Sequence, residues 1–261
     1  MEPYSDELSF AADIVRTCAR DYVRSKEVRV NDKGNDMDVH DVVTDLDIST
    51  EKRIRDEIRR RYPGDSFIGE ETAEDGSLGK RSWILDPIDG TLNFVRGIPL
   101  FGTQLALLVG ERPVMSVIYL PVYDMLFTAT EEGAFLNGKP VHVADGLPLK
   151  ECIVAMCDFS RKDHRFREVQ YSLIGGMYDK VARMKMFGAA CCDFAYLACG
   201  KADIHFRYMN HIWDFLPGLY LCEKAGAYID PELKEKGFLL MAATEQEAHE
   251  FRREVIGDIQ I

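Results

Sequence analysis

The stretch WILDPIDGTLNF, residues 83–94, decides the interpretation of this chain, because an apolar run ends at two acids and a Gly-Thr pair. Residues 83–85 predict a buried strand, which places Asp86 and Asp89 where the strand passes into a turn. One interpretation is a simple turn, in which Gly90 permits a positive φ and an Asp caps the following helix. The other is a binding site for a hard cation, which the rest of the chain must support.

The composition narrows the class of protein. The 261 residues carry 44 acids and 32 bases, and this formal net charge of -12 argues against unspecific binding to nucleic acid or to an anionic membrane face. No apolar run approaches the roughly 18 to 20 residues of a membrane span, and the N-terminus MEPYSDELSF is acidic where a signal peptide is basic. Seven cysteines without a C-x-x-C pair are typical of reduced core residues. We therefore expect a cytoplasmic globular protein with no nucleic-acid partner and no membrane partner.

The first half of the chain predicts helices that cover a sheet. Helical spacing of apolar residues indicates helices over 5–26 and 48–62, separated by a polar loop over 30–41. A short strand over 65–69 and β-rich runs over 101–143 predict an antiparallel or mixed sheet on which these helices pack.

The second half alternates between strand-like and helical segments, which is typical of an α/β unit. The segments are strand ECIVAMCDF, helix HRFREVQYSLIGGMYDKV, strand-like RMKMFG, helix CCDFAYLACG, strand KADIHFRY and helix DFLPGLYLCEKAG. No Ser/Gly-rich linker separates the halves. We therefore predict one continuous domain over residues 1–261, with a helix-and-sheet half over about 1–147, an α/β half over about 148–261, and a site between two layers.

Acids recur at the borders of apolar stretches. They are Asp47 in TDLD, Glu70 in IGEE, Asp86 and Asp89 in DPID, and Asp214 in WD. Clustered carboxylates repel one another and lose hydration, so several can share a partly buried pocket only if cations compensate their charge. Mg²⁺ meets that need, because it prefers oxygen ligands and commonly bridges protein carboxylates to a substrate phosphate.

Four motifs together resemble those of the inositol monophosphatase family. They are DVVTDLD at 41–47, GEE at 69–71, WILDPIDGTLNF, and WDFLPGLYLCEKAGA at 213–227, and they occur in family order over nearly the whole chain. The resemblance implies an α/β (α+β) fold, a layered α-β-α-β-α sandwich of the inositol monophosphatase/fructose bisphosphatase type. It further implies a Mg²⁺-dependent phosphoric monoester hydrolase that forms a homodimer.

The same resemblance implies a set of metal ligands for two to three Mg²⁺ ions. Glu70, Asp86 and the backbone carbonyl of Ile88 resemble the ligands of a first ion. Asp86 would bridge to a second ion held by Asp89 and Asp214, and a third ion would be held mainly through Glu70 and water.

Catalytic and substrate-binding roles carry over in the same way. Thr91 and Asp47 match the pair that orients and helps to deprotonate the attacking water, and Glu70 joins them through the third ion. The backbone amides of Gly90 and Thr91 would meet the phosphate at a helix start. The implied substrate-binding set is Asp89, Gly90, Thr91, Gly188, Ala190, Arg207 and Asp214.

Arg207 departs from the family pattern, because many inositol monophosphatases carry a Glu at this place, seven residues before the WD acid. An arginine offers a planar donor fork suited to a second phosphate or a carboxylate, although a surface arginine without a ligand is an equal alternative. Small residues at Gly188 and Ala190 likewise fit either substrate approach or helix packing.

The leading hypothesis is therefore hydrolysis of a small phosphate monoester, with inositol 1-phosphate as the first compound to test. Arg207 motivates the alternatives of a 3'-phosphoadenosine 5'-phosphate or fructose 1,6-bisphosphate phosphatase. A different class of function is an interaction protein of the transcription machinery, as some bacterial family members are. Asp86→Asn and Asp89→Asn variants that lost hydrolysis but kept the full cellular phenotype would favour that class.

Overall fold

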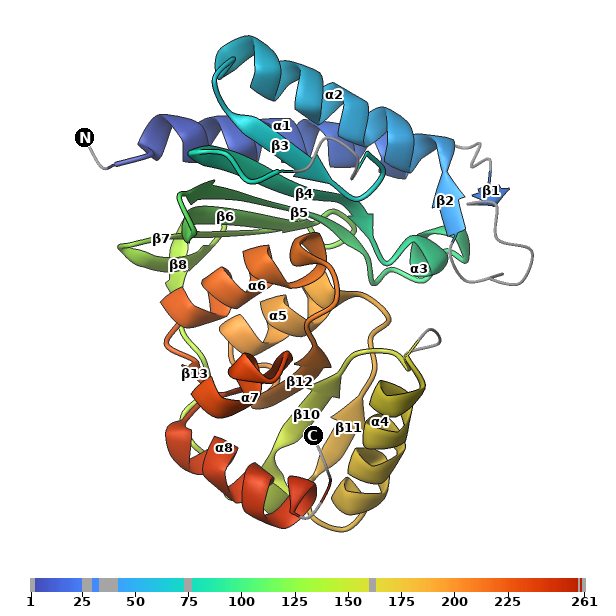
Figure 1. Ribbon diagram of the computed structural model, residues 1–261, viewed down its shortest axis with the longest axis vertical. Helices are drawn as coiled ribbons and strands as arrows, with labels where there is room; N and C mark the ends of the chain where they lie inside the picture. Colours follow the sequence, from blue (N-terminus) through green and yellow to red (C-terminus); the bar gives the residue numbers. More distant parts are fainter. Residues whose placement is uncertain are drawn as a thin grey trace.

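A computed structural model describes residues 3–24, 30–32, 42–72, 77–159, 163–257 and 259. Figure 1 shows five layers, in which helices alternate with two large sheets from one end of the molecule to the other. The predicted α/β fold with a layered α-β-α-β-α sandwich is thus confirmed.

The outer helical layer and the larger sheet come from the first half of the chain. The sheet has seven strands in the order β3-β4-β5-β6-β7-β8-β9, with β3 parallel to β4 and every later neighbour antiparallel, so the predicted mixed sheet is confirmed. The elements are α1 (Ser5–Arg24), β1 (Val30–Asp32), β2 (Val42–Thr44), α2 (Asp45–Arg61), β3 (Ser66–Gly69), β4 (Arg81–Asp89), α3 (Thr91–Val95), β5 (Gly102–Val109), β6 (Arg112–Leu120), β7 (Met125–Thr130), β8 (Gly133–Leu136) and β9 (Lys139–Val141).

The second half supplies the middle helices, a smaller sheet and the other outer layer. The smaller sheet has the order β11-β10-β12-β14-β13, and β14 and β13 are antiparallel to their neighbours. The elements are η2 (Leu149–Glu151), β10 (Ile153–Met156), α4 (His164–Met177), β11 (Arg183–Lys185), α5 (Ala190–Ala198), β12 (Ile204–Tyr208), α6 (Ile212–Lys224), β13 (Tyr228–Ile229), α7 (Pro231–Glu235), β14 (Phe238–Ala242), α8 (Glu245–Phe251) and the π-helical turn η3 (Arg252–Ile256).

Alternation along the strands explains why both faces of each sheet are covered. In β4, Trp83 and Leu85 pack beneath α1 and α2, whereas the intervening Ile84 packs toward α6. In β14, Leu239 and Met241 face the middle helices, while Leu240 faces α4 and α8. Because successive side chains of a strand point to opposite faces, each sheet needs two apolar partners, and the layers follow.

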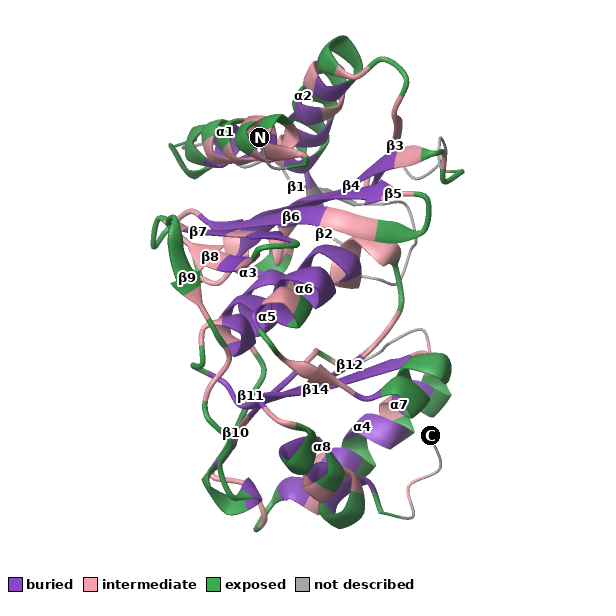
Figure 2. Ribbon diagram, turned by 90° about the vertical axis from the view of Figure 1, so that its left-hand side faces the viewer, coloured by how far each residue is buried: buried purple, intermediate pink, exposed green. Residues whose placement is uncertain are grey.

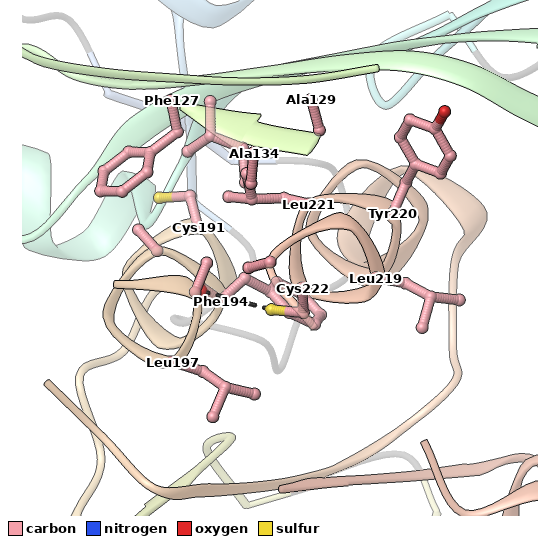
Figure 3. Packing of buried hydrophobic residues seen from close by; sticks show 14 of the residues in the cluster. Phe127, Ala129, Ala134, Cys191, Phe194, Leu197, Leu219, Tyr220, Leu221 and Cys222 are labelled. Carbon is pink, nitrogen blue, oxygen red and sulfur yellow. Dashed lines mark hydrogen bonds between the residues drawn. The ribbon is translucent and has the colours of Figure 1, made fainter. Parts of the chain in front are cut away.

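The middle layer consists of two largely buried helices. α5 and α6 lie between the two sheets and are buried over most of their length (Figure 2). Small residues allow the close approach, since a Cβ at Gly218 would lie 2.0 Å from the ring of Phe194 on the facing helix. Figure 3 shows this packing, with the Cys222 thiol donating to the carbonyl of Phe194 at 3.4 Å.

Two local predictions need correction. The strand predicted to end at Asp86 continues to Asp89, because a register shift between these residues absorbs Pro87, which has no N–H for the ladder. Part of the loop predicted over 30–41 is strand β1, which pairs antiparallel with β2. Residues 33–41 of that loop lie outside the described residues.

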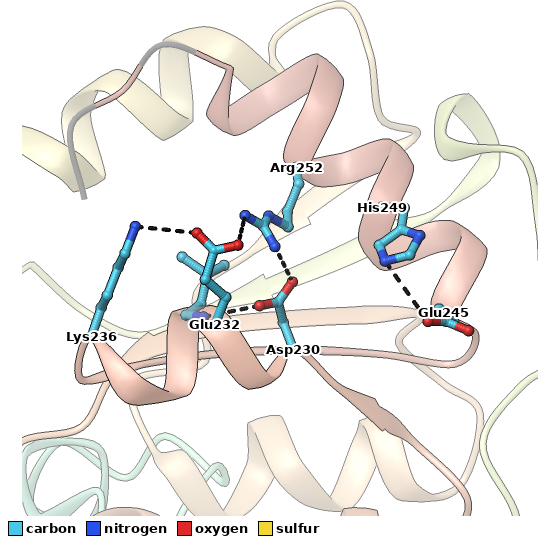
Figure 4. Close-up of polar contacts among 7 residues, drawn as sticks. Asp230, Glu232, Lys236, Glu245, His249 and Arg252 are labelled. Carbon is cyan, nitrogen blue, oxygen red and sulfur yellow. Dashed lines mark hydrogen bonds and ion pairs between the residues drawn. The ribbon is translucent and has the colours of Figure 1, made fainter.

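The C-terminal segments are joined by a network of charges. The buried carboxylate of Asp230 caps α7, accepting from the backbone N–H of Leu233 at 2.9 Å, and also accepts from Nη1 of Arg252 at 3.0 Å (Figure 4). The same guanidinium reaches Glu232 at 2.8 Å. These contacts tie α7 to η3 and leave both Asp230 oxygens paired.

None of the helices in the described part of the chain has the length and apolar character needed to span a lipid bilayer.

Candidate active site

Asp47 is placed by the capping of α2. Thr44 is the N-cap, and Oδ2 of Asp47, three residues on, accepts from the Thr44 backbone N–H at 2.8 Å, which completes a capping box. The Thr44 hydroxyl also donates to Asp47 Oδ2. One carboxylate oxygen of Asp47 is therefore anchored, and Oδ1 is left to face another element.

That other element is the start of α3. The Thr91 hydroxyl lies 3.1 Å from Asp47 Oδ1 and 2.9 Å from the carbonyl oxygen of Ile88. One hydroxyl proton serves these two acceptors, so the Thr91 oxygen is held between Asp47 and the end of β4. The structure thus brings together Asp47, Thr91 and Ile88, all predicted site residues.

The bulged end of β4 presents two acids, of which Asp86 is buried and Asp89 half-buried. Asp86 is 2% exposed, and its Oδ1 has no hydrogen-bond partner among the described residues. Asp89, three residues on, pairs in register with Gly102 after the shift, and Gln104 Nε2 donates to it at 3.3 Å. The bulge is the local cause, since an irregular strand end re-aims side chains that regular alternation would send to opposite faces.

Asp89 also caps a distant helix. Its carboxylate accepts from the backbone N–H groups of Ala190, at 3.2 Å, and Cys191, at the start of α5. Asp89 does not cap the helix that follows it directly, whose N-cap is Gly90 with a φ of 87° and no side-chain bond. The simple-turn interpretation is therefore right that Gly90 adopts a positive φ. It is wrong that an Asp of this stretch caps the helix that follows, because Asp89 caps α5.

Gly90 and Gly188 let the loops around this site approach one another. A Cβ at Gly90 would lie 2.8 Å from the Cβ of Ala189 and 3.0 Å from the Leu100 carbonyl oxygen. Gly188 has a φ of 71° and lies against Asn93, which donates to the Phe187 carbonyl oxygen at 2.8 Å. The segment with Gly188 and Ala190 is thus fastened beside α3, and its contact with substrate remains a prediction.

Glu70 follows β3 and is held by its neighbours. Its backbone N–H donates to the Leu85 carbonyl at 3.2 Å, which sets it beside Asp86. Glu51 of α2, one turn after Asp47, accepts from the backbone N–H of Glu71 at 2.8 Å and from the Thr72 hydroxyl. One face of α2 therefore positions both Asp47 and the backbone that follows Glu70.

Asp214 lies in the first turn of α6, within the middle layer. Arg207 of β12 donates from Nη1 to the backbone carbonyl of Asp214 at 2.9 Å and from Nη2 to the side chain of Asn210 at 3.3 Å. Arg207 is only 5% exposed, so the interpretation as a surface arginine is wrong. Its predicted contact with substrate stays a prediction.

The acids perturb one another. Burial raises the pKa of Asp86 well above its usual range, and the neighbouring charges of Glu70, Asp89, Asp214 and Asp47 raise it further. Burial likewise raises the pKa of Asp214 to about 7, an effect that the Arg207 guanidinium opposes.

Asp47 and Asp89 respond to the same environment. Burial raises the pKa of Asp47 to about 6, while its hydrogen bonds from Thr44 oppose the rise. The pKa of Asp89 is raised by burial and lowered by the Cys191 amide. Carboxylates whose pKa values are raised together in this way are typical of functional sites.

The donor set fits hard divalent cations. It consists of carboxylates and a backbone carbonyl, and the unpartnered Oδ1 of buried Asp86 is a ligand atom without another use in the fold. Within the described ranges, no three His, Cys, Asp or Glu side chains already stand in a closed ligand geometry. Among the described residues the acids are therefore neighbours and do not form a preformed cage, and their binding of cations stays a prediction.

Sequence reasoning missed three residues that support this site: Glu51, Asn93 and Asn210. Glu51 could have been found from its spacing, because it lies four residues after Asp47 on the same helical face. Asn93 and Asn210 bind backbone or side-chain groups brought near by the fold, and no local pattern signals such contacts.

Comparison with known proteins agrees with this architecture. A model of the inositol monophosphatase family matches residues 5–259. The inositol monophosphatase of Mesembryanthemum crystallinum is 33% identical over 240 residues, which cover 89% of this chain and 88% of that protein. A protein of Aquifex aeolicus named fructose-1,6-bisphosphatase/inositol-1-monophosphatase is 31% identical over 202 residues, which cover 77% of this chain and 75% of that protein. The crystal structure of the extragenic suppressor protein suhB from Bartonella henselae has a TM-score of 0.85 at 26% identity and covers 98% of this chain and 100% of its own.

Fold, acids and relatives define the class as phosphoric monoester hydrolases that depend on metal ions. Within that class, the chain belongs to the inositol monophosphatase family, which confirms the resemblance seen in the four motifs.

Proposed function

We propose that this protein hydrolyses a small phosphate monoester, with inositol 1-phosphate as the first candidate, through direct attack of water. The observation that carries the proposal is the Thr91 hydroxyl held between Asp47 Oδ1 and the Ile88 carbonyl, beside the buried, unpartnered oxygen of Asp86. A water-orienting pair thus lies next to carboxylates suited to cations.

Glu70, Asp86, the Ile88 carbonyl, Asp89 and Asp214 would hold two to three Mg²⁺ ions. When bound, such ions neutralise the phosphate dianion, lower the pKa of water and stabilise the departing alkoxide. The proposal also includes a cytoplasmic homodimer, by analogy with the family.

Asp47 and Thr91 act on the attacking water in different ways, since Asp47 accepts its proton and Thr91 orients it. Asp47 Oδ2 is anchored by Thr44, so Oδ1 keeps a fixed direction from which it can accept a proton. In the absence of cations burial raises the pKa of Asp47 to about 6, and bound cations would lower it again, which favours the ionised carboxylate that a general base needs. Thr91 fixes the angle of attack through its hydroxyl, and the amides at Gly90 and Thr91 would meet the phosphate oxygens.

A bisphosphate phosphatase is the second candidate. The double name of the Aquifex aeolicus relative favours it, because that name joins fructose 1,6-bisphosphatase with inositol 1-monophosphatase. The 3'-phosphoadenosine 5'-phosphate phosphatase alternative rests on Arg207 alone.

The test is phosphate release with Mg²⁺ from inositol 1-phosphate, fructose 1,6-bisphosphate and 3'-phosphoadenosine 5'-phosphate, with EDTA-treated protein as control. We expect the highest kcat/KM for inositol 1-phosphate. Thr91→Ala should lower kcat about 10- to 100-fold with little change in Mg²⁺ affinity, and Thr91→Ser should restore most of it. Negligible release from inositol 1-phosphate beside rapid release from either other compound would overturn the choice of substrate.

A further inference from the structure

Arg207 occupies an unusual place for a charged side chain. It lies on β12, two residues after His205 and on the same face, which is turned toward α5. Its guanidinium lies over the Phe194 ring, 5.4 Å from the centroid. One broad side of the donor fork is therefore covered by the middle layer of the fold.

Three of the five N–H donors of the Arg207 guanidinium form hydrogen bonds within the chain. Nη1 donates to the Asp214 carbonyl at 2.9 Å, Nη2 to Asn210 Oδ1 at 3.3 Å, and Nε to the Tyr208 carbonyl at 3.3 Å. Each of the three guanidinium nitrogens thus has an acceptor in the stretch that runs from the last residue of β12 to the first turn of α6. An arginine that selected a second phosphate would need a pair of these nitrogens directed at the ligand.

Asn210 connects the guanidinium to the side chain of Asp214. Its oxygen accepts from Arg207, and its side chain lies close enough to the Asp214 carboxylate to oppose the rise in the pKa of that group. Arg207 therefore reaches Asp214 by two routes, directly through the backbone carbonyl and indirectly through Asn210. We call Arg207, Asn210 and Asp214 the Arg207 clamp.

We infer that Arg207 is a positioning residue, which through the clamp holds the first turn of α6 so that the Asp214 carboxylate faces Asp86 and Asp89, and that it does not select substrates by a second phosphate. This inference rests on the proposed function for its catalytic consequence. A lysine cannot replace the clamp, because one ammonium group lacks the planar fork that bonds two acceptors while lying on a ring.

The consequence concerns substrate class. If the fork is held by Asp214 and Asn210, the site gains no preference for a bisphosphate from Arg207. Every phosphate monoester should depend on Arg207 to the same degree, whatever the rest of the molecule carries. A fork that bound substrate would instead matter only for compounds with a second anionic group.

The test compares Arg207→Lys, Arg207→Met and Asn210→Ala with wild type and with Arg183→Met, a control on the exposed edge strand β11. Isothermal calorimetry measures Mg²⁺ binding without substrate. Kinetics measure kcat and KM for p-nitrophenyl phosphate, inositol 1-phosphate and fructose 1,6-bisphosphate. Thermal unfolding of each variant reports whether it folds. If Arg207→Met does not fold, the comparison is made with Arg207→Lys and Asn210→Ala.

We expect the clamp variants to bind Mg²⁺ about tenfold more weakly and to lose kcat by one common factor on all three substrates, with Arg183→Met unchanged. Unaltered Mg²⁺ affinity together with a raised KM for the bisphosphate alone would overturn the clamp and show that the fork binds substrate. Wild type that binds Mg²⁺ but hydrolyses none of the three would overturn the proposed function, and calorimetry would still decide the clamp. Wild type that binds no Mg²⁺ would overturn both.

Discussion

Asp230 and Asp86 are two buried carboxylates that differ in the partners that the fold gives them. Asp230 has both oxygens paired, one with the Leu233 amide and one with Arg252, as Figure 4 shows. Asp86 has an oxygen without a partner among the described residues and is surrounded by other acids. A buried charge with a full set of partners stabilises the chain, whereas one held beside like charges destabilises it until a cation binds.

The difference lies in what each neighbourhood supplies. η3 brings a guanidinium to Asp230, and α7 brings an amide. The charges that act on Asp86 are those of acids, chiefly Glu70, Asp89 and Asp214, whereas the Arg207 guanidinium acts on Asp89 and Asp214, so we propose that a cation from outside the chain balances Asp86. We therefore expect Asp230 to serve stability and Asp86 to serve function, and four experiments test this distinction.

The largest effect is expected from Asp86→Asn. This variant should lose kcat/KM on the order of 1000-fold with Mg²⁺, because it removes a charge that two cations would share. Without Mg²⁺ it should melt at a higher temperature than wild type, since one of the mutually repelling charges is gone. Phosphate release and thermal unfolding with and without EDTA check both parts. Equal Mg²⁺ affinity for the variant and wild type in calorimetry would contradict the role of Asp86.

The second effect is a pH dependence of stability in the absence of cations. Burial raises the pKa of Asp47 from 3.8 to about 6 and that of Asp214 to about 7, so the folded chain holds these protons more tightly than the unfolded chain does. The contribution of these two protonated groups to the free energy of unfolding is therefore fully present below about pH 4. It is lost as the pH rises through about 6 for Asp47 and about 7 for Asp214. For Asp47 alone the free energy of unfolding falls by on the order of 2 to 3 kcal/mol over this range of pH.

Urea unfolding in EDTA at about pH 5 and about pH 8 measures this dependence. Asp47→Asn should show a smaller fall in the free energy of unfolding than wild type between these two pH values, and Mg²⁺ should reduce the fall in wild type. An identical fall in both proteins would show that Asp47 titrates as it does in the unfolded chain.

The third experiment concerns Asp230, where we expect a substitution to lower stability and leave activity unchanged. Asp230→Asn should lower the free energy of unfolding by about 2 kcal/mol, because it weakens a buried charge-assisted contact with Arg252. Its kcat should equal that of wild type. Glu232→Gln is the matched control, since the Glu232 side chain is 54% exposed and its contact with the same arginine should contribute little. A large loss of kcat in Asp230→Asn would remove the distinction between the two acids.

The smallest effect is expected at Glu51, which serves the site without touching substrate. Glu51→Gln should weaken Mg²⁺ binding and lower kcat about tenfold, because one acceptor for the Glu71 amide or the Thr72 hydroxyl is lost beside Glu70. Glu57→Gln on the same helix is the control, because Glu57 pairs with Arg60 at the surface. Equal Mg²⁺ binding by Glu51→Gln and wild type would confine Glu51 to a structural role.

Local features could be predicted from sequence where local physics governs them. The apolar spacing in α1 and α2 and the left-handed Gly90 follow from the residues themselves. Asp47 lies at the start of α2 as expected, because Thr44 and Asp47 form a capping box within one turn. The acids of the site were recognised by their motifs, and their roles in binding cations remain predictions.

Other features depended on contacts between distant segments. β4 runs through Pro87 because the β5 strand continues to pair with it beyond a bulge, which no local pattern indicates. The loop expected before Asp41 begins as β1 because β2 offers it a partner.

Periodicity and short motifs in the sequence indicate the order of most elements, the family and the set of acids. The capping of α5 by Asp89, about a hundred residues away, and the burial of Arg207 against Phe194 with its fork on Asp214 and Asn210 arise from the folded arrangement alone. The physical reason is that a polar group takes whichever partner packing brings within about 3 Å, and residues far apart in the chain meet only when the layers close.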